Sequence, residues 1–256
     1  MSADDCEAGV MMTMTCASCG IAEADEVKLK ECANCDLVRY CSDKCQENHA
    51  SQHKEACKKR AVELRDELLF KQLESTHLED CPICCLPLPL DTTKSTMHYC
   101  CSKVVCLGCD YANDFRIYEG GGKLEHRCPF CREPVPSKIE ECDKQRMKRI
   151  EANDPVALCE EGVKQYVKAD CSSAFEYFTR AAELGDVEAH NSLSYMYRDG
   201  HGVEKDRGKA IYHLEEAAIG GHPDARFNLG CEEDESGNIE RAVKHYIINQ
   251  TADRVL

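Results

Sequence analysis

The chain has 256 residues, a net charge of -15 at pH 7 and 21 cysteines. This acidic balance argues against phosphate-backbone binding as a main role, because such affinity comes from clustered lysine and arginine. The first 14 residues are acidic and lack an apolar run, and no stretch approaches the roughly 20 apolar residues that span a bilayer. We therefore expect a cytoplasmic or nuclear protein that binds other proteins, with no nucleic acid and no membrane as partner.

Most of the cysteines fall into CxxC pairs within the first 131 residues. In a reducing compartment such cysteines favour metal over disulfides. Zinc takes four tetrahedral sulfur or nitrogen ligands, and a CxxC turn brings two thiolates to one ion. Since four ligand pairs occur twice, we predict two modules with two zinc ions each. The predicted fold class is multidomain: two small zinc-stabilised modules followed by an α-helical repeat solenoid.

Residues 1–13 are expected to be a disordered N-terminus, and the first module is predicted to cover residues 14–58. Its eight candidate ligands are Cys16, Cys19, Cys32, Cys35, Cys41, Cys45, His53 and Cys57. The last two lie four residues apart in a polar segment without Gly or Pro, so they share one face of a predicted helix. The segments between the pairs are too short for an apolar core, so metal is expected to supply most of the folding energy.

The order and spacing of these ligands, with Tyr40 before Cys41 and Gln46 after Cys45, resemble the MYND zinc finger. The resemblance implies interleaved sites: one ion would take Cys16, Cys19, Cys41 and Cys45, and the other Cys32, Cys35, His53 and Cys57. MYND fingers dock proline-containing peptides, often with a Trp shortly before the ligand His, and this chain has no Trp. His49 is expected to be a solvated helix residue, because eight better-spaced ligands already exist.

Residues 59–78 are predicted to form a helical linker. Apolar residues recur at helical spacing from Ala61 through Leu64 and Leu68 to Leu73, which is typical of an amphipathic helix. We expect this helix to pack on one zinc module; the alternative is a short coiled-coil contact.

The second module is predicted to cover residues 79–136. Its two ends, Cys81-Pro-Ile-Cys84 and Cys128-Pro-Phe-Cys131, resemble the ends of a RING finger, and Cys106-Leu-Gly-Cys109 resembles its middle. The resemblance implies that one ion takes the first and third pairs. The second ion would take Cys128 and Cys131 with a central pair.

The central pair departs from the common RING pattern, because Lys103 stands where a ligand His is expected. A protonated lysine has no lone pair for a metal. Two assignments remain open: Cys100 with Cys101, or His98 with Cys101. We favour the all-cysteine assignment and expect Cys85 to be a packing residue.

RING fingers recruit a ubiquitin-conjugating enzyme through an apolar residue in the first CxxC and a basic residue beside the last Cys. By resemblance these contacts would be Ile83 and Arg132, with Pro129 in the neighbouring loop. The alternative is structural: Ile83 would be a core residue of the zinc knuckle and Arg132 a solvated charge.

Residues 137–153 are predicted to be a charged helical connector, and residues 154–256 to be helical repeats. The pattern of Ala189, Leu193 and Tyr197 restarts at Ala225 after 36 residues, which predicts stacked helical hairpins. Glycines are expected to end helices at positive φ, as at Gly200. A capping box of Ser173 and Glu176 is expected to begin a second helix.

These residues resemble the Sel-one-like repeat, a relative of the tetratricopeptide repeats, which implies a scaffold with a concave binding face. Asn249 and Gln250 stand where the repeat would have two alanines. The segment from Lys244 to Leu256 is therefore expected to be either a polar cap or an incomplete copy.

Two functions remain open at this point. The first is a RING-type ubiquitin ligase that binds a ubiquitin-conjugating enzyme, with substrate on the repeats or the MYND module. The second is a non-catalytic adaptor with structural zinc only. Neither needs a catalytic residue of this chain, and a catalytic zinc site is not expected, because such a site keeps an open position and these ligands are nearly all cysteine.

Overall fold

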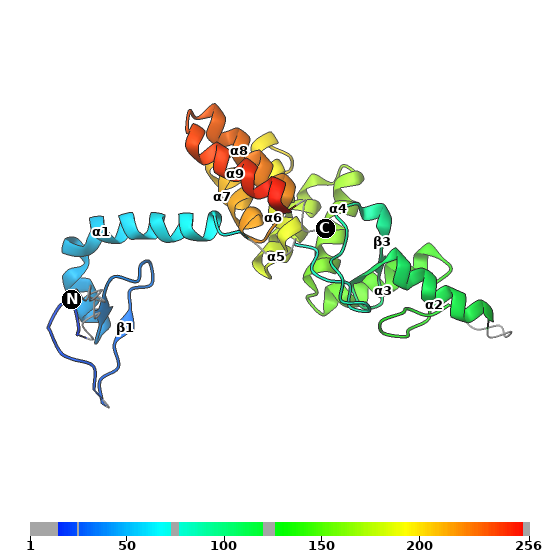
Figure 1. The fold of residues 1–256 in the computed structure, drawn as a ribbon, viewed down its shortest axis with the longest axis horizontal. Helices are drawn as coiled ribbons and strands as arrows, with labels where there is room; N and C mark the ends of the chain where they lie inside the picture. The colour runs from blue at the N-terminus through cyan, green and yellow to red at the C-terminus, as the bar shows by residue number, and fades with distance from the viewer. Residues whose placement is uncertain (1–14, 25, 73–76, 120–125, 253–256) are drawn as a thin grey trace, which may run out of the picture. The chain divides into compact units, whose positions relative to one another are not determined.

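The computed structural model describes residues 15–24, 26–72, 77–119 and 126–252, so the segment expected to be disordered, residues 1–13, lies outside the described residues. The chain divides into two units, Met1–Leu69 and Phe70–Leu256. Within the described ranges, no helix combines the length and the apolar character needed to cross a membrane. Figure 1 shows the elements along the chain.

The first unit contains a two-stranded sheet and one long helix. Strand β1 (Lys30–Glu31) pairs antiparallel with β2 (Arg39–Tyr40). Helix α1 (Asp43–Leu69) has 27 residues and continues past residue 58, where the module was expected to end. It has no Gly or Pro to stop it. The small core consists of Cys16, Cys32, Cys35 and Tyr40.

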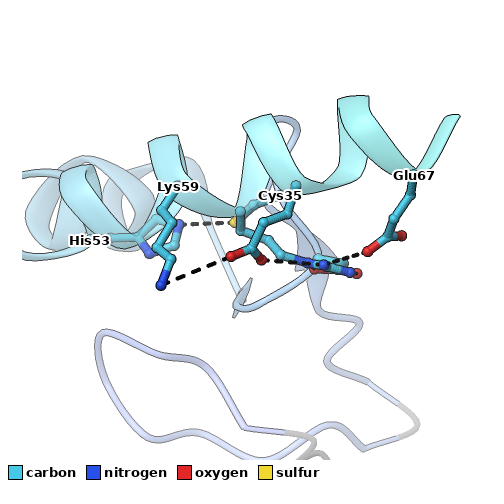
Figure 2. A network of polar contacts seen from close by, with 7 residues as sticks. Cys35, His53, Lys59 and Glu67 are labelled. Atoms are coloured by element: carbon cyan, nitrogen blue, oxygen red, sulfur yellow. Dashed lines mark hydrogen bonds and ion pairs between the residues drawn. The ribbon is translucent and has the colours of Figure 1, made fainter. Parts of the chain in front are cut away.

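Ion pairs fix α1 to the loop before β2. Arg60 donates to Asp36 through two nitrogens, at 2.7 and 2.8 Å, and to Glu67 at 2.8 Å. Figure 2 shows this network along one side of α1, with His53 at one end, Glu67 at the other and Cys35 between them. The linker helix is therefore a direct continuation of the helix that carries His53.

The second unit begins with a small zinc-finger-like region. A 3₁₀ helix, η1 (Thr92–Lys94), leads into β3 (Ser95–His98), which pairs antiparallel with β4 (Lys103–Cys106). Helix α2 (Leu107–Glu119) follows directly. The buried core of this region is only Cys81, Leu88 and Val105.

Helix α3 (Ile139–Glu151), in the predicted charged connector, packs against the repeats. Ile150 belongs to the main apolar core of the repeats. Arg146 is buried and donates to the buried carboxylate of Glu161 at 3.0 Å, while its guanidinium lies 5.6 Å from the ring of Tyr99. The charges of the predicted connector are thus partly used in buried pairing.

Six further helices form three hairpins. Each hairpin pairs two consecutive helices, and neighbouring hairpins contact one another, so α6 to α9 lie side by side in Figure 1. The helices are α4 (Pro155–Val167), α5 (Cys171–Glu183), α6 (Val187–Asp199), α7 (Arg207–Ile219), α8 (Pro223–Glu235) and α9 (Ile239–Ala252).

The helix ends correct one expectation and confirm another. Asp170, not Ser173, caps α5: its carboxylate accepts from the backbone amide of Ser173 at 3.1 Å, so the expected capping box is wrong. Asp is as good an N-cap as Ser, and it stands one turn earlier. Gly200 does end α6 at a φ of 77°.

Close packing inside the hairpins depends on a small residue opposite a large one. In the third hairpin a Cβ added at Gly230 would lie 2.4 Å from the ring of Tyr246. Gly230 and Tyr246 are the eighth residues of α8 and α9. The eighth residues of α6 and α7 in the middle hairpin are Ser194 and Leu214. The larger aromatic residue therefore requires the smaller partner.

We expect Gly230→Ala to lower the free energy of unfolding of the repeats by about 1–3 kcal/mol, because the added methyl group overpacks against Tyr246. Adding Tyr246→Leu should restore part of the loss. Gly208→Ala is the control, since its Cβ would meet only a side-chain atom of Asp206 at 3.4 Å. Urea unfolding followed by circular dichroism measures the difference; equal stability of the two alanine variants would contradict this account.

Candidate metal centres

The structure brings the sixteen predicted ligands into four groups, and within each group the ligand atoms lie within 4.8 Å of one another. The groups are Cys16, Cys19, Cys41 and Cys45; Cys32, Cys35, His53 and Cys57; Cys81, Cys84, Cys106 and Cys109; and Cys100, Cys101, Cys128 and Cys131. Every cysteine among the described residues is a free thiol. Each group could hold one zinc ion.

In the first unit the two groups share α1. The beginning of α1 supplies Cys45, and its next turns supply His53 and Cys57 on one face. The Nε2 atom of His53 lies 3.2 Å from the sulfur of Cys35, as Figure 2 shows. The sulfur atoms of Cys32 and Cys57 are 3.8 Å apart.

Sulfur separations in the four groups match those around a tetrahedral ion. With zinc–sulfur bonds of about 2.3 Å, tetrahedral ligands stand about 3.8 Å apart. The observed separations include 3.5 Å between Cys19 and Cys41, 3.6 Å between Cys41 and Cys45, 3.8 Å between Cys84 and Cys106, and 3.9 Å between Cys101 and Cys128. The spacing of these side chains is therefore compatible with one tetrahedral ion in each group.

Backbone amides prepare two of the cysteines as thiolates. Burial raises the pKa of Cys16, but hydrogen bonds from the backbone of Cys41, Cys19 and Ser18 outweigh this and lower it to about 6. Burial likewise raises the pKa of Cys81, and backbone hydrogen bonds from Cys106, Cys84 and Ile83 lower it to about 6. The thiolate is the form that binds metal, so these turns favour the ligating state.

His53, the candidate ligand on α1, is also in the neutral form that binds metal. Burial, with a smaller contribution from the nearby His49, lowers the pKa of His53 and keeps the imidazole neutral. His49 is not simply solvated as expected: its Nδ1 lies 3.1 Å from the hydroxyl of Tyr40, and its ring stacks on that of His53. It therefore positions the neighbouring candidate ligand.

In the second unit the β3–β4 turn carries the central pair. Both Cys100 and Cys101 reach the group, with the sulfur of Cys100 at 3.3 Å from that of Cys131. His98, the alternative to Cys100, lies outside the group, and its Nε2 is 3.3 Å from a carboxylate oxygen of Asp110 on α2. The geometry thus favours the all-cysteine assignment, and the ligand role itself is a proposal.

The three predicted contact residues differ in exposure. Ile83 is 42% exposed, so it lies on the surface of its CxxC turn. Pro129 is buried inside the last CxxC turn and offers no contact surface. The neighbouring Phe130 is 44% exposed and is the apolar side chain that this turn presents, which the sequence reasoning missed.

Arg132 is exposed and is hydrogen-bonded to a residue of α2. Its guanidinium donates to the side-chain oxygen of Asn113 at 3.0 Å, and the Asn113 amide donates to the carbonyl of Arg127 at 2.9 Å. Arg132 itself has a φ of 67°, in the left-handed region. These bonds fix the last knuckle against α2.

Helix α2 also carries a stripe of exposed apolar side chains. Leu107, Tyr111 and Phe115 follow one another at intervals of four residues and are all exposed. Residues at this spacing lie on one helix face. The second zinc-finger-like region therefore presents apolar groups from α2 and from the first and last of its CxxC turns.

Comparison with known families identifies two kinds of module in the chain. Residues 16–57 match the MYND finger, and residues 157–186, 187–222 and 223–248 match the Sel1 repeat. The chain therefore carries a MYND zinc finger and stacked Sel1 repeats. The four cysteine-rich groups are consistent with several zinc ions, two groups lying beyond the MYND finger.

One curated relative is chitin synthase regulatory factor 4 of Schizosaccharomyces pombe, which is 34% identical over 71 residues. The match covers 27% of this chain and 11% of that protein. Among solved structures, a Sel1 repeat protein from Oxalobacter formigenes aligns with 24% identity and a TM-score of 0.42, over 56% of this chain and 57% of that chain.

We expect Cys100→Ser and Cys101→Ser each to release one zinc ion, because serine is a poor zinc ligand and leaves a three-ligand site. His98→Ala should retain the wild-type metal content, since His98 stands outside the group. Mass-spectrometric metal analysis of folded, freshly reduced protein measures the ratio. If His98→Ala loses one zinc ion and Cys100→Ser retains the wild-type zinc content, His98 rather than Cys100 is the ligand.

Proposed function

We propose that this chain is a protein-interaction protein of the cytoplasm or nucleus, whose second zinc region, residues 79–136, acts as a RING finger that binds a ubiquitin-conjugating enzyme. The observation that carries the proposal is that Ile83 is exposed on the first CxxC turn of this region. The two cysteine groups of the region also interleave along the chain. One group joins the first and third ligand pairs, and the other joins the second and fourth. This is the ligand order that a RING finger requires.

The exposed apolar side chains support this proposal. Phe130 on the last CxxC turn and Tyr111 and Phe115 on α2 add to the exposed apolar surface of this region. Aromatic residues are enriched at the centres of protein interfaces, where a few anchors carry most of the binding energy. A conjugating enzyme docking here would cover side chains that now face water.

In this proposal the MYND finger and the Sel1 repeats hold the substrate protein. Both kinds of module point to protein partners, and the chain needs no nucleophile of its own, because the conjugating enzyme carries the activated ubiquitin. The repeats supply a surface built from successive hairpins, which suits extended protein segments.

The second candidate is a non-catalytic adaptor, and the engagement of Arg132 favours it. A basic side chain that stabilises a ubiquitin-loaded enzyme must reach that partner, whereas Arg132 is already bonded to Asn113 at 3.0 Å. The S. pombe relative is named as a regulatory factor. An adaptor would use the same modules without transferring ubiquitin.

Substituting the contact residues separates the two functions. We expect Ile83→Ala and Arg132→Ala to keep the wild-type zinc content, because neither side chain is a candidate ligand. In an autoubiquitination assay across a panel of conjugating enzymes, each should reduce chain formation about tenfold or more, as for an interface anchor worth 1.4 kcal/mol or more.

Val167→Ala is the matched control, because Val167 is an exposed apolar residue on α4, outside the zinc region. It should leave the rate unchanged. A wild-type protein that is inactive with every conjugating enzyme would refute the ligase and leave the adaptor.

A further inference from the structure

Outside the four cysteine-rich groups, a fifth cluster of metal-binding side chains lies in the second unit. It contains His77, Glu188 and His222, whose ligand atoms lie within 4.8 Å of one another. His77 comes four residues before Cys81, Glu188 lies in the first turn of α6, and His222 is the N-cap of α8. The cluster therefore joins the beginning of the second zinc region to two successive hairpins.

The three side chains are closely packed and partly open to solvent. The Nε2 atom of His222 is 2.9 Å from a carboxylate oxygen of Glu188, and the rings of His77 and His222 stack with centroids 4.6 Å apart. His222 is buried, whereas the side chain of Glu188 is 49% exposed. An ion could thus reach the cluster from the Glu188 side.

Two buried polar atoms of this neighbourhood are left without hydrogen bonds among the described residues. They are Nδ1 of His77 and Oδ1 of Asn191. Asn191 lies three residues after Glu188 on α6 and is hydrogen-bonded to that carboxylate. A buried polar atom without a partner is costly, and a bound water or ion is one way in which such an atom is satisfied.

We propose that His77, Glu188 and His222 form a fifth metal site that takes a divalent transition ion, with zinc as the ion it is most suited to bind. Two imidazoles and one carboxylate are a common donor set for zinc. Nδ1 of His77 supplies the free lone pair. A water molecule completes the coordination and donates a hydrogen bond to Oδ1 of Asn191, which accounts for both unpartnered atoms.

Ion binding requires one proton to move on His222. Its Nδ1 accepts a hydrogen bond from the backbone amide of Ala225 at 3.4 Å, and its Nε2 therefore carries the proton that faces Glu188. When Nε2 coordinates the ion, this proton transfers to Nδ1 through solvent, and the long bond from Ala225 is lost. The carboxylate of Glu188 then binds the ion instead of the imidazole proton.

The consequence is a metal link between distant parts of the chain. Residues 77 and 188 are separated by more than a hundred residues, and closing so long a loop stabilises the folded state mainly by restricting the unfolded chain. The proposed ion would fasten the segment that leads into Cys81 onto α6 and α8. It would thereby hold the second zinc region to the repeats.

Metal analysis of Glu188→Gln in the full-length chain tests this site. Glutamine retains an oxygen that can accept from His222, so a purely hydrogen-bonded cluster would keep its structure, but the charge that the ion needs is removed. After dialysis against buffered zinc, we expect Glu188→Gln and His77→Ala each to contain one zinc ion fewer than the wild type.

His201→Ala is the matched control, because His201 is exposed and lies outside the cluster, paired with Tyr166. It should retain the wild-type zinc content. Circular dichroism establishes that each variant keeps its helices. If folded Glu188→Gln and His77→Ala both bind as much zinc as the wild type, the cluster is held by hydrogen bonds and ring stacking alone, and the proposed site is wrong.

Discussion

The two cysteine-rich regions depend on ligand pairs that alternate along the chain. In the MYND finger one group closes the segment from Cys16 to Cys45 and the other closes the overlapping segment from Cys32 to Cys57. An ion in either group would therefore hold a loop that contains candidate ligands of the other. The small buried core of the first region consists mostly of candidate ligands, whereas that of the second is Cys81 with Leu88 and Val105. Structural zinc contributes about 10–16 kcal/mol in small finger peptides, which is the scale of energy such a region needs.

The repeats have a different source of stability. Their buried apolar side chains are mostly alanine and leucine, and one cluster of them runs from α3 through the first hairpin into α6. Helix α3 extends this core through Ile150, and its buried Arg146 contacts Tyr99 on one side and Glu161 on the other. The second zinc region and the repeats thus meet at α3 through a few specific side chains. One of these parts is expected to need metal for its fold, and the other is stabilised by an apolar core.

Local chemistry explains what could be predicted from the sequence. A CxxC turn fixes two ligands within four residues, so the grouping of the cysteines followed from spacing and from resemblance to known fingers. The period of 36 residues likewise predicted the helical hairpins, because each repeat must bury the same positions. Helix caps were predicted less well, since Asp170 and Ser173 are both good caps and only the path of the backbone selects between them.

Long-range contacts explain what was missed. Nothing in the sequence near His77 indicates Glu188 or His222, because only the stacking of two hairpins brings these residues together. The sequence indicated α3 only as a charged connector, because Glu161, the buried partner of Arg146, is brought to it by folding. The solvent exposure of side chains in the CxxC turns could not be predicted from the sequence either. Pro129 and Phe130 are adjacent, yet Pro129 is buried and Phe130 is exposed.

The central claim is that metal maintains the cysteine-rich regions while the repeats maintain themselves. Hydrogen exchange measured by mass spectrometry, before and after a strong zinc chelator is added, tests this claim most directly. The account predicts that peptides from residues 15–57 and 78–135 lose protection on chelation, whereas the helices between residues 155 and 250 keep most of theirs. Loss of protection throughout the repeats, or none in the cysteine-rich regions, would contradict it.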